Sequence, residues 1–294
     1  MQYKLKRLSD SVSVGEIANV HFFEFPEDFY TGFDHHPFYE MVYVSSGVLN
    51  IRSDSFNGKL KKNEAVIHAS DEKHSLSCVK GNAPTVIIVG FTCNGLPRNV
   101  TGKATALSVY ETGLLSAVIK EGRSVFAPPY DVPTYDMQKK KNIPFGAEQN
   151  LKNCIELLMI SLARRTSGST FKEDSPVGAF DADEVLKYVN ENFKEKITID
   201  ELSFIFGTNR SSLCKDFKKR TGKSINGYVI EKKLCEAQRL LKDTQDTVTE
   251  IADKLNFTSI HYFTAFFKKA TGLSPTEYRE KRGNLSIPCH CGRL

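Results

Sequence analysis

A duplicated segment in the last third of the chain places the strongest constraint on how it can fold. The run from Leu213 to Ser224 matches the run from Phe263 to Ser274 at an offset of 50 residues, and both contain Lys-Lys-x-Thr-Gly. Each run follows a short apolar segment and a turn residue, Gly207 or Asn256. Gly and Asn adopt left-handed backbone at low cost, and Gly is the preferred residue just past a helix end. The repeat therefore predicts two helix-turn-helix units.

Positive charge is concentrated in the same region. Residues 207–282 contain 16 Lys and Arg against 9 Asp and Glu, whereas the other 218 residues carry a net charge of −2. A local basic excess of this kind is what a nucleic-acid-binding domain needs. A helix over Ser224–Lys242 would span roughly 28 Å and could set the two units about one duplex turn apart. A helical repeat used for protein contacts is the alternative.

Residues 181–282 resemble the DNA-binding domain of the AraC/XylS family of bacterial transcription regulators. The resemblance is carried by the run from Thr247 to Arg279, which reads TVTEIADKLNFTSIHYFTAFFKKATGLSPTEYR. It contains, in the family's order, Ile-Ala, Phe, Tyr-Phe, Phe-Lys, Gly, Ser-Pro and Tyr-Arg. The match covers about a third of the chain, and its motifs are specific.

The resemblance implies that two reading helices, about Arg210–Lys219 and Ser259–Lys269, enter successive major grooves. Arg210 and Lys215 are the side chains able to bind a guanine edge. The chain departs from the family pattern at Ala265, where relatives often carry Arg, and this removes a guanine contact. The implied DNA-binding residues are Arg210, Ser211, Cys214, Lys215, Lys218, Lys219, Ile260, His261, Thr264, Lys268 and Lys269.

The first hundred residues have a different pattern. Short runs rich in β-branched and aromatic residues alternate with turn residues, and Asn57-Gly58 is a hairpin signal. Many short strands at even spacing predict a small antiparallel barrel. The fold class expected for the whole chain is multidomain α+β, with a cupin-like N-terminal barrel, flanking helices and an all-α C-terminal region. The expected strands are 20–25, 40–44, 48–51, 65–68 and 85–89.

The order His36, three residues, Glu40, six residues, Gly47 resembles the first half of a cupin signature, and His74 stands where the second half ends. His36, Glu40 and His74 are chemically competent to bind a divalent metal. AraC-type sensor domains usually hold a small effector without metal, so we expect polar lining residues here, with no metal and no cofactor. The expected effector-binding residues are His36, Tyr39, Glu40, Tyr43 and His74.

An enzyme is the second hypothesis, with a metal-dependent cupin and an accessory helical domain. The chain contains no G-x-S-x-G, P-loop or H-E-x-x-H motif, and no coherent catalytic set otherwise. We therefore expect a regulator that is not an enzyme.

One helix outside the repeat draws attention. Between Ala147 and Arg165, apolar residues recur at helical spacing. The stripe is wider than one packing surface needs, which suggests contact with a second copy of the chain. An ordinary buried helix is the equal alternative. The expected dimerisation residues are Leu151, Ile155, Leu158 and Leu162.

These patterns predict five segments. They are a sensing barrel at 1–110, a helical dimerisation segment at 111–165, a linker at 166–180, the DNA-binding domain at 181–282 and a tail at 283–294. The expected partners are promoter DNA, a small-molecule effector such as a sugar, a second copy of the chain and RNA polymerase.

A cytoplasmic location is expected from three sequence features. The chain has no apolar run of about 18 residues and no signal-peptide core after its basic start. Its seven scattered cysteines are typical of reduced thiols.

Overall fold

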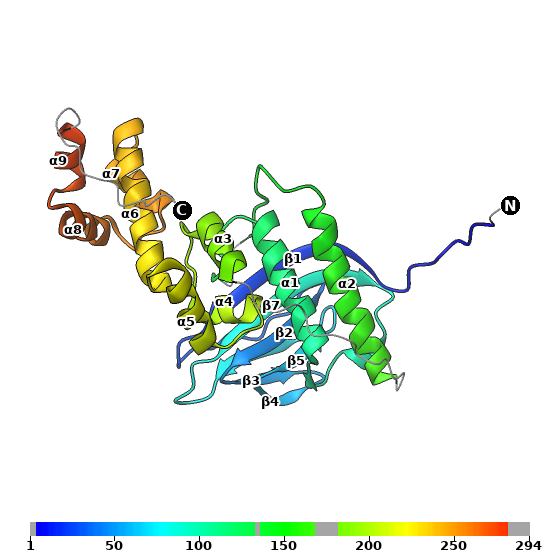
Figure 1. Ribbon diagram of the computed structural model, residues 1–294. Coiled ribbons are helices and arrows are strands. Elements are labelled where there is room, and N and C mark those ends of the chain that lie inside the picture. Colours follow the sequence, from blue (N-terminus) through cyan, green and yellow to red (C-terminus); the bar gives the residue numbers. More distant parts are fainter. Residues whose placement is uncertain (1–3, 133–135, 168–181, 282–294) are drawn as a thin grey trace. The chain divides into compact units, whose positions relative to one another are not determined.

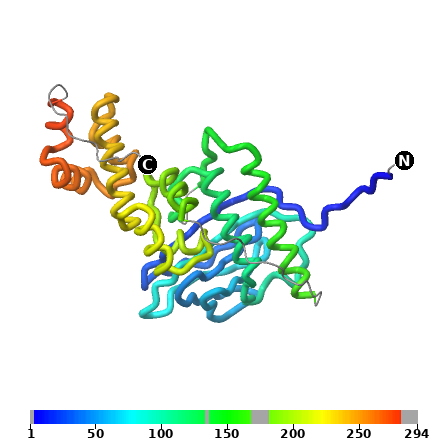
Figure 2. Tube along the Cα trace, in the orientation of Figure 1, coloured from blue at the N-terminus to red at the C-terminus, as the bar shows by residue number. Residues whose placement is uncertain are grey.

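The computed structural model of the chain describes residues 4–132, 136–167 and 182–281 (Figures 1 and 2). The chain divides into two compact units, Met1–Ala179 and Phe180–Leu294. Every strand of the described residues lies in the N-terminal unit, and the C-terminal unit is helical there. Most of the expected linker at 166–180 and all of the expected tail at 283–294 lie outside the described residues.

The N-terminal unit contains two antiparallel sheets. One holds, in spatial order, β1 (Ser13–Glu24), β7 (Thr85–Asn94), β2 (Tyr39–Ser46), β5 (Glu64–His68) and β8 (Thr105–Ala106). The other holds β4 (Asn57–Lys61), β3 (Val48–Ser53) and β6 (His74–Cys78). The predicted antiparallel architecture is confirmed as two sheets.

Strand alternation decides which side chains enter the core of this unit. On β2, Val42 faces the same side as its cross-strand partners Val66 and Ile88, and all three belong to one buried cluster. The residues between them point to the opposite face, because side chains alternate along a strand. On that face helices α1 (Val109–Val125) and α2 (Ala147–Thr166) pack against β1 (Figure 1). Strand β7 is covered on both faces, which explains its nearly continuous apolar sequence.

The predicted hairpin forms, but its turn lies elsewhere. Asn57 and Gly58 are already in β4, where they pair with Arg52 and Ile51. The connection is closed by Ser53, whose backbone N–H donates to the Phe56 carbonyl at 2.8 Å while its hydroxyl accepts from the Phe56 N–H at 2.9 Å. The expectation of an Asn-Gly turn is therefore wrong, because a serine side chain closes the loop one step earlier.

Helix α2 buries the stripe that was assigned to a dimer surface. Leu151, Ile155, Leu158 and Leu162 are each at most 2% exposed within a single chain. These four side chains are core residues, so their assignment to an intermolecular contact is wrong. Leu157, which is 46% exposed, lies on the outer face of the same helix. Self-association itself stays a prediction.

The C-terminal unit is a series of helices joined by short connections. Their order repeats a short helix followed by a 12-residue helix, once on each side of the long helix α6. The helices are α3 (Ala182–Asn192), α4 (Ile199–Ile205), α5 (Arg210–Thr221), α6 (Ile225–Asp243), α7 (Val248–Lys254), α8 (Ile260–Thr271) and α9 (Pro275–Glu280).

Two further expectations concern the cysteines and the membrane. Cys78, Cys93, Cys154 and Cys214 are free thiols. These four positions agree with the expected reduced thiols. Within the described part of the chain, no helix has both the length and the apolar character that crossing a membrane requires.

Adjacent leucines of α2 provide a direct test of which face is buried. Leu158→Asp places a carboxylate in the core and should lower the free energy of unfolding of the N-terminal unit by more than about 3 kcal/mol. Leu157→Asp, one position along the chain, should change it by less than about 0.5 kcal/mol. Urea unfolding of the two full-length variants measures both values, and similar losses would contradict the assigned orientation of α2.

Candidate nucleic-acid interface and histidine cluster

The first repeat (α4 and α5) and the second repeat (α7 and α8) are built by the same local interactions. Helix α5 begins where Asn209 Oδ1 accepts the Ser212 N–H at 2.8 Å, and α8 begins where Ser259 Oγ accepts the Tyr262 N–H at 3.1 Å. Such caps satisfy a backbone donor that the helix leaves unpaired. Both helices end at a left-handed glycine, Gly222 or Gly272, whose N–H donates back into the last turn. The predicted helices and their Thr-Gly ends are confirmed.

The turns inside the two repeats are also equivalent. Gly207 has a φ of +57° and Asn256 a φ of +51°. Only glycine and a few polar residues adopt this left-handed conformation readily. Asn256 is therefore as compatible with its turn as Gly207 is.

One aromatic pair anchors each repeat to the helix that follows it. Phe217 and Tyr228 have ring centroids 5.6 Å apart in a T-shaped arrangement, and Phe267 and Tyr278 are 5.2 Å apart in the same arrangement. Both phenylalanines are fully buried. T-shaped pairs contribute about 0.5–1.5 kcal/mol beyond the area they bury. The buried face of each 12-residue helix is thereby fixed, which leaves the opposite face at the surface.

The predicted DNA-binding residues occupy exposed and half-buried positions of α5 and α8. None of the eleven is buried. Their contact with DNA stays a prediction. On α5 the exposed ones are Arg210, Ser211, Lys215, Lys218 and Lys219, with Cys214 half-buried; on α8 they are His261, Lys268 and Lys269, with Ile260 and Thr264 half-buried.

Arg210 has a partner inside the first repeat. Its Nη1 lies 3.0 Å from Asp200 Oδ1 on α4, while the arginine side chain is 64% exposed. An exposed pair of this kind contributes little to stability, typically about 0–1 kcal/mol. The arginine can therefore exchange this carboxylate for another acceptor at low cost.

Sequence reasoning missed two residues at the second repeat. Tyr262 is a 60% exposed aromatic on the same helix as His261. Lys233 on α6 donates from Nζ to the Leu255 carbonyl at 2.7 Å, just past α7, and lies over the Phe257 ring. Burial lowers the pKa of Lys233, against an opposing effect of Glu195. The lysine thus ties the long helix to the second turn, a role that the sequence pattern does not indicate.

An ionic group joins α6 to the segment after α3. Glu236 accepts two hydrogen bonds from Arg239 and lies 2.8 Å from Lys194 Nζ. The hydrogen bonds from Arg239 outweigh the effect of burial and, with Lys194, lower the pKa of Glu236 to about 2. The carboxylate form is therefore favoured by the fold.

A second site lies between the sheets of the N-terminal unit. Glu40 extends from β2, His74 from the start of β6, and His36 from the loop before β2. Glu40 Oε1 is 3.1 Å from His74 Nε2, and Glu40 Oε2 is 3.5 Å from His36 Nε2. Three of the five expected effector-binding residues are thus brought together.

The other two lie on the opposite face of β2. Tyr39 stacks beside Phe91, and the Tyr43 hydroxyl donates to Asn63 Oδ1 at 3.1 Å. Because neighbouring side chains on a strand point to opposite faces, neither ring can share a cavity with Glu40. The expectation that all five residues line one site is wrong for the two tyrosines.

Glu40 is held in its charged form. Burial acts to raise its pKa, but the interactions with His36 and His74 prevail and lower it to about 2. Burial likewise acts to lower the pKa of His74, and Glu40 more than reverses this, so the pKa of His74 is raised. The cluster is therefore a polar, charged site between the two sheets.

Two further histidines stand beside this cluster and were not anticipated. His68 pairs directly across from Glu40 on β5, and its ring stacks on His74 with centroids 4.3 Å apart. His21 on β1 is buried too, and its ring nitrogen Nδ1 lies 3.0 Å from the Tyr130 carbonyl oxygen. Only strand register places these residues near Glu40, so spacing along the sequence gave no signal.

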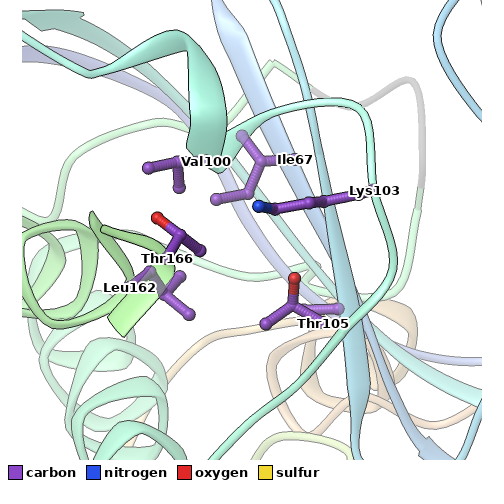
Figure 3. Close-up of a pocket in the computed structure, with 7 residues that line it drawn as sticks. Ile67, Val100, Lys103, Thr105, Leu162 and Thr166 are labelled. Carbon is purple, nitrogen blue, oxygen red and sulfur yellow. The ribbon is translucent and has the colours of Figure 1, made fainter. Parts of the chain in front are cut away.

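The hollows of this unit differ in size. A small one between β5, the connection from β7 to β8 and α2 has a volume of about 10 Å³, room for about one water molecule (Figure 3). A larger open groove of about 440 Å³ has Phe38 on one side. The groove is also lined by Gly15, Glu16, Ile17, Ala18, Thr92 and Lys139.

Comparison with known proteins agrees with the helical repeats. Residues 202–281 match the family described as the helix-turn-helix domain. The uncharacterized HTH-type transcriptional regulator YdiP of Escherichia coli K12 is 22% identical over 250 residues, 83% of this chain and 79% of that protein. A regulator from the cgkA 5′ region of Pseudoalteromonas carrageenovora, likewise uncharacterized and HTH-type, is 36% identical over 92 residues, 31% of this chain and 54% of that protein.

Among solved structures, the DNA-binding domain of the global transcriptional factor AdpA, in complex with a target DNA, matches 35% of this chain and 92% of that chain. The identity is 25% and the TM-score 0.33. The chain spans about half the length of the Pseudoalteromonas relative that it matches.

The ionic group on α6 makes stability depend on pH. A carboxyl group whose folded pKa is depressed stabilises the fold above its unfolded pKa of about 4.3, and that stability is lost as pH falls toward the folded value. Glu236→Gln should therefore destabilise the C-terminal unit by about 1–2 kcal/mol at pH 7. The difference from the parent chain should shrink between pH 5 and the folded pKa of about 2.

Unfolding curves across this pH range measure the effect. Glu280→Gln on α9 removes one carboxylate from the same unit and serves as the matched control. A constant difference between parent and Glu236→Gln chains at all pH values would contradict the ionic role.

Proposed function

We propose that this chain, whose residues 202–281 match the helix-turn-helix domain family, is an AraC-type, sequence-specific DNA-binding transcription regulator that responds to an effector. The proposal rests on one observation above all. The same capped, 12-residue helix occurs twice in one unit, each time with its buried face fixed by a phenylalanine and its opposite face exposed.

The spacing between the two copies supports contact with neighbouring major grooves. Helix α6 has 19 residues, so it is roughly 28 Å long at 1.5 Å per residue. One turn of duplex DNA is about 34 Å. A connector of this length matches the separation between successive grooves on one face of the duplex.

The exposed side chains divide into two chemical groups. Arg210 and Lys215 can bind the O6 and N7 atoms of guanine, which gives base preference. The Lys-Lys pairs near the helix ends, at 218–219 and 268–269, suit phosphate oxygens, and each phosphate neutralised adds affinity that falls with salt. The second helix carries Ala265 where the first carries Lys215, so it offers a methyl contact instead of a charged one.

Control by an effector is the finer part of the proposal. A ligand that binds one arrangement of the N-terminal unit better than another shifts the equilibrium toward that arrangement, and the same coupling changes the affinity for DNA. The open groove beside Phe38 is lined by one acidic side chain, Glu16, and one basic side chain, Lys139, and it is large enough for a small polar molecule. The outer face of α2 at Leu157 is the surface we assign to a second copy of the chain.

Substitution of Lys215 can distinguish a contact with a base from a contact with a phosphate. Lys215→Ala should lower affinity for the specific site by about 1–3 kcal/mol and relax preference at one base pair. Fluorescence anisotropy with specific and random duplexes at several salt concentrations measures both effects. Lys187→Ala on α3 removes the same charge from an exposed position outside the repeats and should leave both affinities nearly unchanged.

Two outcomes would count against the assignment. Equal losses on specific and random DNA would mean that Lys215 contacts phosphate alone. A full-length chain that shows no salt-dependent binding to any duplex would remove the proposed function altogether.

A further inference from the structure

We propose that the outer face of the three-stranded sheet in the N-terminal unit binds the phosphate backbone of duplex DNA. This basic sheet face consists of Arg52, Lys59 and Lys61, together with the amides Asn50 and Asn57. The proposal rests on the proposed function, because the helical repeats would bring the chain to DNA. It adds a second contact surface, which holds the duplex without reading its bases.

Strand alternation places the three cationic side chains on one face. Leu49 and Ile51 of β3 and Leu60 of β4 belong to the buried core of the unit. The residues next to them in the sequence point to the opposite side of the sheet. The cationic side chains on that side are exposed. The core contacts of the three apolar residues therefore fix the cations at the surface.

Strand register makes the cations neighbours. Arg52 pairs across from Asn57, and Asn50 pairs across from Lys59. Lys59 and Lys61 stand two positions apart on β4, so their Cα atoms are roughly 6.8 Å apart. Arg52 is the diagonal neighbour of Lys59, at about 7–8 Å. Positive charges at this spacing repel one another, and an anionic partner removes the repulsion.

Carboxylates do not neutralise this face. Among the residues that the structure describes, none forms an ion pair with the three cationic side chains. The two carboxylates beside them bind backbone: Asp54 Oδ2 accepts the Lys73 N–H at 3.2 Å, and Glu64 Oε2 accepts the Lys61 N–H at 2.8 Å. The chain outside residues 207–282 has a net charge of −2, so the basic sheet face is a local excess of positive charge.

The extent of the face favours a long polyanion over one small anion. Strand β4 rises roughly 14 Å from Asn57 to Lys61 at 3.4 Å per residue. Phosphates recur about every 3.4 Å along each strand of duplex DNA, so a backbone segment of this length presents about four of them. The middle row of the face, Lys59, Asn50 and Ser77, consists of hydrogen-bond donors. Amides and hydroxyls join Lys and Arg in binding phosphate oxygens.

Protection of the sheet edge is the competing explanation. Strand β4 is at the edge of its sheet, and lysines on an edge strand prevent pairing with another chain. This explanation accounts for Lys59 and Lys61. Arg52, however, belongs to β3, which is paired on one side with β4 and on the other with β6. Its positive charge therefore has no edge to protect.

The salt dependence of DNA binding by the full-length chain tests the face. Each neutralised phosphate contributes about 0.9 to the steepness with which log affinity falls against log salt. On a random duplex of about 40 bp, Arg52→Gln/Lys59→Gln/Lys61→Gln should reduce this steepness by about 2–3 and lower the affinity at low salt at least about tenfold. On a duplex of about 20 bp, which the two grooves bound by the repeats already occupy, variant and parent should bind alike. Fluorescence anisotropy measures both.

A matched variant separates the clustered charge from net charge. Lys6→Gln/Arg98→Gln/Lys141→Gln removes two lysines and one arginine from exposed, scattered positions of the same unit. It should keep the parent's salt dependence on both duplexes. All the substituted positions are exposed, so the melting temperatures should also stay at the parent's value.

A charge-preserving variant completes the test. Arg52→Lys/Lys59→Arg/Lys61→Arg should bind like the parent, because neutralising phosphate requires the charge and not one particular side chain. A parent chain that binds both duplexes while the glutamine variant of the face keeps its salt dependence would overturn this proposal and leave the proposed function intact. An equal loss in the scattered variant would overturn it too. A parent chain that binds neither duplex would remove both proposals.

Discussion

One kind of contact, a phenylalanine packed against a tyrosine, occurs twice in the C-terminal unit and determines which faces of α5 and α8 are exposed. Phe217 meets Tyr228 and Phe267 meets Tyr278, and each pair joins a 12-residue helix to the helix after it. Because the buried face of each helix is fixed, the opposite face has no freedom to turn inward. The surface chemistry of α5 and α8 is therefore a direct consequence of these two contacts.

Sequence reasoning succeeded where structure is local. The caps of α5 and α8, at Asn209, Ser259 and the two Thr-Gly ends, involve residues only a few positions apart. The helix ends predicted from the sequence therefore agree with those in the structure. It failed where structure depends on distant partners. Periodicity identified α2 but could not tell a core face from a contact face, because both are apolar, and Leu158 proved to be buried.

The same distinction applies to the histidine cluster. The spacing of His36 and Glu40 was informative, since both stand within one short segment. His68 lies beside Glu40 because β2 pairs with β5. Tyr39 and Tyr43 lie on the opposite face of β2 because side chains alternate along a strand. Register is a property of the folded sheet, so a single sequence does not reveal it. The chemistry of a buried site is thus less predictable than that of a capped helix.

The two repeats share a backbone but differ in what they display. Positions 210 and 215 of the first hold arginine and lysine, whereas the equivalent positions 260 and 265 of the second hold isoleucine and alanine. A nearly symmetric scaffold therefore carries cations at these two positions in the first repeat and apolar side chains there in the second. Because the two repeats differ in this way, we expect a DNA site that binds both of them to be asymmetric in sequence, so that the chain binds it in one orientation.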